Sequence, residues 1–402
     1  MATTMWRASL GFSWPGLIAS GAVLCFLSGP ALAGDVAEAR PASLASSTGD
    51  AVEIIRSVVN EAIEEKHLQA VLLGVRVGNE DVARLAFGES MRGVPATPDM
   101  QVRNGAIAIA YLGHLLLQLV DRGVVGLDDP ISTWVPELPS AEQVTLRMLI
   151  NCTSGYPDYV PYQAFMEAFY ADVFRTWTPE DLITIAFEQP PEFAPGQGWS
   201  YAHTNFVILG RVLERATGET LAWLMNRFVL GPLQLWNTTT SDTPSIPEPV
   251  LHAYTAERSA FYGFEREIYE DSTFWNPSWT LARGAVMTTN LADVLTSAQA
   301  IGTGAGLSDG AFSQMLAPDT SGFKPWNPSR YFGLGVIVAN GWILQTPLFH
   351  GYAGVMAYLP QQQISVAIFN TRSQEAEVDD ENVSFSIFKR LTELFTPDHV
   401  VR

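Results

Sequence analysis

Hydrophobic residues in the first part of the chain follow two different periods. From Ala51 to Lys66 they recur every three to four positions, which is the spacing of an amphipathic helix. Leu68–Val77 and Val82–Phe87 are apolar runs separated by Gly-Asn-Glu-Asp, a turn-forming sequence. The pattern therefore predicts one helix followed by two paired strands.

The middle of the chain, from Ala106 to about Leu235, has mostly helical spacing. Thr178-Pro179-Glu180-Asp181 is a typical helix start, and Gly218 is a typical helix end. The predicted helical segments are 112–122, 145–150, 162–174, 179–187, 205–217 and 220–228.

Strand-like runs return near the C-terminus. A helix capped by Asn290 and ending near Ile301 comes first, and a terminal helix is predicted over Val383–Phe395. Between them lie four runs that predict an antiparallel meander: 331–338, 344–350, 355–359 and 364–370.

Composition narrows the class of protein. A chain of 402 residues with 47% hydrophobic content can bury a large core. Its net charge of −19 and pI of about 4.6 argue against binding to nucleic acid or to an anionic membrane surface. Lysine occurs only at Lys66, Lys324 and Lys389, so the long middle of the chain offers no lysine as a catalytic base.

The N-terminus has the features of a secretory signal peptide over residues 1–33. Arg7 precedes an apolar stretch, and Ala31-Leu32-Ala33 is a typical cleavage site. Residues 34–50 predict a disordered leader. We therefore expect an exported mature protein, secreted or held in the cell envelope or periplasm; retention of the segment as a membrane anchor is the alternative.

Three motifs carry a resemblance to a known family. The first is Arg103-Asn104-Gly105-Ala106-Ile107-Ala108-Ile109 with its following helix, and the second is Tyr201-Ala202-His203 preceded by Pro-Gly. The third is His350-Gly351-Tyr352-Ala353-Gly354. With the intervening Thr-Ser-Gly and Pro-Asp-Tyr, this layout resembles the serine β-lactamase and D-alanyl-D-alanine carboxypeptidase family, from about Ala51 to Phe395.

The resemblance implies a β-lactamase/transpeptidase-like α+β fold. Its antiparallel sheet is built from both chain ends, flanked by terminal helices and interrupted by an all-helical insert. The expected domain is 51–397, in which 51–104 and about 276–397 form the α/β part and 105–275 the mainly helical part.

The resemblance also shows what is missing from the first motif. In that family the helix opens with Ser-x-x-Lys, whose serine is the acylated nucleophile and whose lysine acts as a base. Ala106 and Ile109 occupy these positions here. A methyl group and a branched hydrocarbon can neither attack a carbonyl nor accept a proton, so the expected protein is a pseudoenzyme.

The other two motifs are altered as well. Tyr201 and His350 are catalytic remnants, whereas His203 replaces the family's asparagine. Tyr352 falls where the family has a glycine, so its side chain should either fill the cleft or point away from it. The remaining expected cleft residues are Gly351 and Ala353.

Substitute chemistry finds little support in the sequence. Ser321 and Ser386 each begin a Ser-x-x-Lys, but the first lies in a loop and the second inside a predicted helix. Cys152 lacks a neighbouring base. His203 and His350 lack metal-ligand spacing, so neither zinc nor a cofactor is expected.

Three functions remain open. The first is a secreted pseudo-hydrolase that binds a peptidoglycan-like peptide, a small ligand or a protein without cleaving it. The second is an active carboxypeptidase, esterase or β-lactamase with an unrecognised nucleophile. The third is a protein-interaction module whose cleft is blocked by Tyr352.

Overall fold

The computed structural model describes residues 48–264, 268–376 and 381–402. The predicted signal peptide and most of the predicted leader lie outside these ranges. Helix α1 spans Thr48–Lys66, so the helix begins three residues inside the segment predicted to be a leader. Within the described ranges, no helix combines the length and the apolar character needed to cross a membrane.

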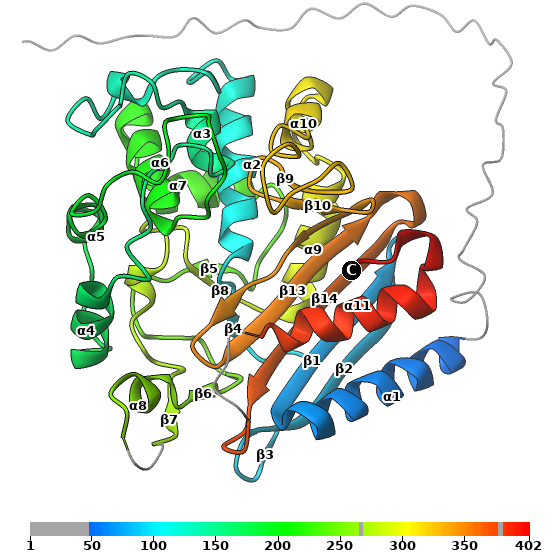
Figure 1. The fold of residues 1–402 in the computed structure, drawn as a ribbon. Helices are drawn as coiled ribbons and strands as arrows, with labels where there is room; N and C mark the ends of the chain where they lie inside the picture. The colour runs from blue at the N-terminus through cyan, green and yellow to red at the C-terminus, as the bar shows by residue number, and fades with distance from the viewer. Residues whose placement is uncertain (1–47, 265–267, 377–380) are drawn as a thin grey trace, which may run out of the picture. The chain divides into compact units, whose positions relative to one another are not determined.

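The largest sheet is antiparallel and has nine strands (Figure 1). Their order is β3-β2-β1-β14-β13-β11-β10-β9, and β12 pairs with β13. The strand bounds are β1 Leu68–Val77, β2 Glu80–Met91, β3 Val94–Pro95, β9 Arg330–Phe332, β10 Ile337–Ala339, β11 Trp342–Gln345, β12 Leu348–Phe349, β13 Tyr352–Leu359 and β14 Ile364–Arg372. Since β1 pairs with β14, the sheet is built from both ends of the chain, as predicted.

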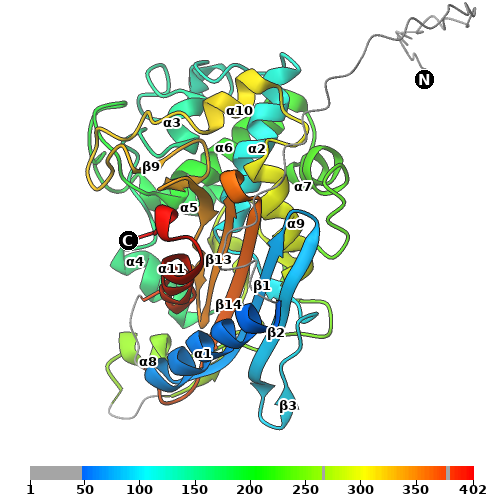
Figure 2. The same ribbon diagram turned by 90° about the vertical axis from the view of Figure 1, so that its right-hand side faces the viewer.

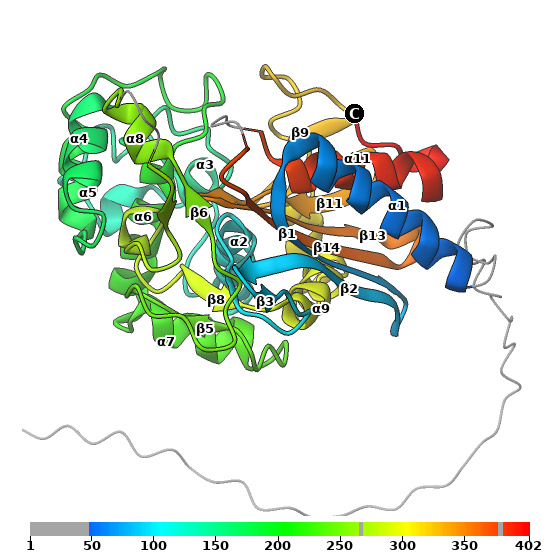
Figure 3. The same cartoon turned by 90° about the horizontal axis from the view of Figure 1, so that it is seen from below.

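Two layers of helix cover this sheet. Figures 2 and 3 show α1 and α11 (Val383–Phe395) on one face and α9 (Leu291–Gly302) on the other. Strands β13 and β14 are buried along almost their whole length, because their side chains alternate between the two covered faces. The central strands are therefore apolar on both sides.

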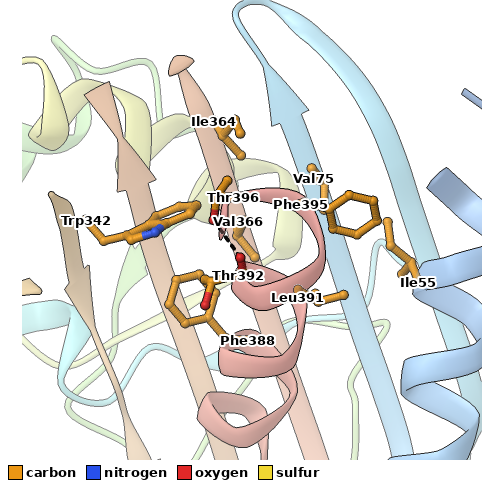
Figure 4. Close-up of a pocket in the computed structure, with 10 residues that line it drawn as sticks. All are labelled: Ile55, Val75, Trp342, Ile364, Val366, Phe388, Leu391, Thr392, Phe395 and Thr396. Carbon is orange, nitrogen blue, oxygen red and sulfur yellow. Dashed lines mark hydrogen bonds between the residues drawn. The ribbon is translucent and has the colours of Figure 1, made fainter. Parts of the chain in front are cut away.

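A small cavity lies between the terminal helices and the sheet (Figure 4). Its volume is about 20 Å³, and apolar side chains from α1, α11 and the strands line it, among them Ile55, Val366 and Phe388. The space is comparable to a single water molecule, so the two helices pack closely on the sheet.

The middle of the chain folds into the predicted helical part. Its helices are α2 Ile107–Asp121, α3 Leu146–Ile150, α4 Gln163–Ala171, α5 Pro179–Ala186, α6 His203–Thr217, α7 Leu221–Met225 and α8 Glu257–Phe261; α10, Asp309–Met315, follows α9. This part is not purely helical, because it also contributes strands to two small sheets. Those sheets are formed by β4 (Val102–Arg103), β8 (Met287–Thr289) and β5 (Thr239–Thr240), and by β6 (Tyr254–Thr255) and β7 (Glu270–Asp271).

Two of the predicted strands are broken. The run 331–338 divides into β9 and β10, because Leu334 turns aside to donate its backbone N–H to Met315 and Gly335 adopts a φ of 83°. The run 344–350 divides at Pro347, whose nitrogen cannot donate a ladder hydrogen bond. Apolar character alone therefore does not show where a strand stops.

Candidate active site

Helix α2 carries the altered first motif. Ala106 is the residue before its first turn, is half-buried and offers no side-chain cap. Ile109, one turn further on, is fully buried in the core. The helix start is formed, but neither position carries a group for nucleophilic or acid–base chemistry.

Tyr201 and His203 come together at the start of α6. Their rings meet edge to face, with centroids 5.0 Å apart. His203 Nδ1 lies 3.0 Å from Asp158 Oδ2, and the backbone N–H of His203 donates to Asp158 Oδ1 at 3.2 Å. One carboxylate therefore fixes both the backbone and the imidazole of His203.

Burial raises the pKa of Tyr201 well above its usual value, with smaller contributions from Cys152 and Asp158. Its hydroxyl is consequently neutral at physiological pH. A neutral phenol can donate a hydrogen bond, but it is a poor base.

Trp279 connects the second motif to the third. Its ring is 6.0 Å from the ring of His203 and stacks on Phe349 at 5.7 Å. A Cβ on Gly105 would approach Cβ of Phe349 to 4.0 Å, so Phe349 also lies next to the residue that precedes Ala106. An aromatic pair thus links the start of α2 with His203.

His350 lies in the tight turn between β12 and β13. Its Nδ1 is 2.6 Å from Glu257 Oε2, and its ring stacks on Phe169 at 4.9 Å and contacts Trp279 at 5.0 Å. Its Nε2 is buried and has no hydrogen-bond partner in the described structure. Burial raises the pKa of Glu257, but His350, the hydrogen bond of Thr255 and the charge of Arg372 together outweigh it, so the pKa is lowered overall.

Gly351 completes this turn with a φ of 85°, and a side chain there would overlap the backbone of Tyr254. Tyr352 is buried and donates its hydroxyl to the carbonyl of Leu251 at 2.5 Å. It makes no ring contact with Tyr201, His203 or Trp279 among the residues described. Of the two orientations expected for Tyr352, the geometry favours the one that points away from the cleft.

Ala353 belongs to the face of β13 that is covered by α11. Its carbonyl accepts a hydrogen bond from Ser384 at 3.1 Å, and the residue is almost fully buried. The structure therefore brings Tyr201, His203 and His350 to one aromatic cluster but orients Tyr352 and Ala353 elsewhere.

The three candidate substitute nucleophiles lie outside the start of α2. Cys152 is fully buried, and burial raises the pKa of its thiol to about 12. Ser386 lies inside α11 and donates to Glu381 at 3.0 Å, whereas Ser321 lies in the loop after α10. A thiol with so high a pKa is protonated at neutral pH and is a weak nucleophile.

Sequence reasoning missed the two acidic partners and the central tryptophan. Asp158 belongs to the Pro-Asp-Tyr segment of the sequence, but its partner His203 lies 45 residues further along the chain. Glu257 and Trp279 had no local signal, because they lie in segments without a motif. Only tertiary structure brings these three residues to the histidines.

Comparison with known proteins agrees with this architecture. The chain superposes on D-amino acid amidase from Ochrobactrum anthropi SV3, complexed with D-phenylalanine, with a TM-score of 0.73 at 21% identity, covering 86% of this chain and 99% of that one. For a D-stereospecific amidohydrolase from Streptomyces sp. the TM-score is 0.71 at 25% identity, covering 83% and 98%.

Curated relatives match over shorter stretches. Penicillin-binding protein 4* of Bacillus subtilis (strain 168) is 29% identical over 145 residues, 35% of this chain and 30% of that protein. Esterase EstB of Burkholderia gladioli is 30% identical over 191 residues, 44% and 48% of the two chains. The matched stretches thus span less than half the length of these two relatives. The model of the Beta-lactamase family matches residues 55–385, most of the described structure, and the chain therefore belongs to the Beta-lactamase family.

Proposed function

We propose that this protein is an exported member of the Beta-lactamase family that forms no acyl-enzyme and holds a small acyl compound or peptide without covalent attachment. The main support for this proposal is that Ala106 and Ile109 occupy the start of an otherwise intact α2. Acyl transfer in a serine hydrolase needs both an activated hydroxyl and a group that accepts its proton. Neither is present at these positions.

We infer the ligand class from the relatives and from the partly exposed rings of Tyr201 and His203. Relatives include an esterase and D-alanyl-D-alanine-carboxypeptidase/endopeptidase AmpH, 30% identical over 190 residues. Esters and D-amino acid peptides are therefore the first ligands to test. Tyr201 and His203 are partly exposed and offer aromatic surface and one polar edge, which suits a small compound with an apolar group and a carbonyl.

The two other functions have less support. A working enzyme with a hidden nucleophile would need Cys152 or a serine beside a base, but the Cys152 thiol is buried and its pKa is raised to about 12. A protein-interaction module with a blocked cleft would need Tyr352 in the cleft, whereas its hydroxyl is bonded to Leu251.

Export is the proposal for location. It rests on Arg7, the apolar stretch after it and Ala31-Leu32-Ala33, all of which precede the described structure. Detection of the chain in the extracellular or periplasmic fraction, with an N-terminus near Gly34, would support it.

Labelling with a fluorescent penicillin and a fluorophosphonate tests the main proposal. The unaltered mature protein should remain unlabelled, and Ala106→Ser alone should as well, because position 109 still lacks the lysine that would accept the proton of the serine. Ala106→Ser combined with Ile109→Lys should become labelled, provided that thermal unfolding shows it to be folded.

Labelling of the unaltered protein would overturn the proposal, and peptide mapping would identify its nucleophile. Non-covalent binding is tested separately, by calorimetry of the unaltered protein with benzylpenicillin and with D-alanyl-D-alanine. The ligand-binding half of the proposal would be overturned by two results together. Neither compound would give a heat of binding, and the folded Ala106→Ser, Ile109→Lys variant would remain unlabelled.

A further inference from the structure

The pair Asp158–His203 has the geometry of an oriented general base. Asp158 Oδ2 lies 3.0 Å from His203 Nδ1, while Oδ1 accepts the backbone N–H of the same histidine at 3.2 Å. A carboxylate that takes Nδ1–H places the lone pair of neutral imidazole on Nε2. The ring is thus held in the tautomer that can accept a proton at Nε2.

His203 also has the access that a base requires. Its side chain is 19% exposed, whereas those of His252 and His350, each also paired with a carboxylate, are 10% exposed. Within the described chain, Nε2 of His203 has no protein partner. Of these three histidines, His203 has the most exposed side chain.

Aromatic side chains surround the imidazole of His203. The ring of Tyr201 stands perpendicular to His203 at 5.0 Å, and the rings of Tyr159 and Trp279 lie at 5.9 and 6.0 Å. Tyr159 and Trp279 are buried, whereas Tyr201 is half-buried, so the ring of Tyr201 is the one that can face a flat apolar group beside the imidazole. The carboxylate of Asp158 disfavours anionic substrates.

We propose that His203 is a general base that delivers water directly to the carbonyl of a small neutral ester, and that Asp158 is its positioning residue. This inference rests on the proposed function, because a non-covalently held acyl compound keeps its carbonyl open to water. It assigns a catalytic role to a residue that stands where the family has an asparagine.

The reaction balances without any further reactant. His203 Nε2 accepts a proton from water while the oxygen of that water forms a bond to the ester carbonyl carbon. The tetrahedral intermediate then breaks its bond to the alkoxy oxygen, which takes the proton from His203. The products are a carboxylic acid, which ionises in water, and an alcohol, and the imidazole is neutral again.

Tyr201 can assist at the carbonyl oxygen. Because burial keeps its hydroxyl protonated at physiological pH, it can donate a hydrogen bond to developing negative charge. Esters suit this site better than amides, because the alkoxy oxygen leaves more readily than an amide nitrogen, which must be protonated before its bond to carbon can break.

Hydrolysis of p-nitrophenyl acetate by the mature protein tests the inference. The rate should rise with increasing pH, because a general base acts in its deprotonated form, and it should be slower in D₂O. His203→Asn should lower kcat/KM by about 100-fold or more, the usual contribution of a general base. Asp158→Asn should lower it less, since the imidazole remains, and should alter the pH profile.

The matched control is His252→Asn, which removes another histidine held by an aspartate, 2.8 Å from Asp271. Its kcat/KM should equal that of the unaltered protein, and thermal unfolding of every variant should be recorded. No turnover above buffer, or equal rates for His203→Asn and the unaltered protein, would overturn the inference. An acyl adduct during turnover would overturn the proposed function as well, so the two failures are distinguishable.

Discussion

At the scale of single residues, the sequence shows which groups are present but not how they pair. Ala106 and Ile109 follow directly from the motif, and Cys152 is present in the sequence but buried in the structure. The partners of the histidines could not be predicted, because Asp158 and Glu257 are brought to them by tertiary packing. The residues next to Asp158 and Glu257 in the sequence do not predict which histidine each carboxylate pairs with.

Glu257 gives a pH-dependent prediction. Its pKa is lowered in the folded protein, so its contribution to stability is present above the pKa of the unfolded chain, about 4.3 for glutamate, and is lost as the pH falls through the folded value. Glu257→Gln should therefore cost its full amount of stability above the unfolded value of about 4.3 and progressively less as the pH falls below it. Urea unfolding of both proteins at several pH values measures this difference; a cost that stays constant down to about pH 3 would contradict the assignment.

At the scale of elements, hydrophobic period predicts helices better than strand ends. The terminal helix α11 has the predicted bounds, Val383–Phe395. The sequence did not predict the split between β9 and β10. At this split Leu334 donates to Met315 and its carbonyl packs closely against Gly113 on α2. That contact joins residues more than 200 positions apart, and nothing near Leu334 in the sequence reports it.

Substitution of Gly113 tests the contact between Leu334 and α2. Alanine normally favours a helix over glycine by about 1 kcal/mol. At position 113, however, a Cβ would overlap the backbone carbonyl of Leu334. Gly113→Ala should therefore lower the free energy of unfolding by about 1–3 kcal/mol, as overpacking does.

The control for this substitution is Gly310 in α10, where a Cβ would have only Ser308 Oγ near it, at 3.8 Å. Gly310→Ala should leave stability unchanged or raise it by about 0.4–1 kcal/mol. Chemical denaturation measures both variants. Equal effects at the two positions would show that the approach of Leu334 to α2 is not tight.

At the scale of the whole molecule, both ends of the chain form one core. Strand β1 pairs with β14, and helices α1 and α11 pack on the same face of the sheet (Figure 2). The resemblance predicted this arrangement, because the family closes its sheet from both ends. Periodicity alone would have left the pairing of β1 open.

Substitution of Phe388 tests how much the packing of α11 on the sheet stabilises that core. It is fully buried, packs edge to face on Trp342 at 4.9 Å and lines the small cavity of Figure 4. Phe388→Ala should lower the free energy of unfolding by about 3–5 kcal/mol. Leu394→Ala on the same helix, at a side chain that is 49% exposed, should cost less than about 1 kcal/mol. Similar losses at both positions would contradict the packing described.

The central claim is that this member of the Beta-lactamase family passes through no acyl-enzyme. Its most direct test is the intact mass of the mature protein after acid quenching during exposure to excess p-nitrophenyl acetate, with product release followed from the first turnover. We predict an unmodified mass and no burst of nitrophenol. A burst that matches the enzyme concentration, together with one added acetyl group per chain, would contradict the account. It would show that a residue elsewhere in the chain acts as a nucleophile.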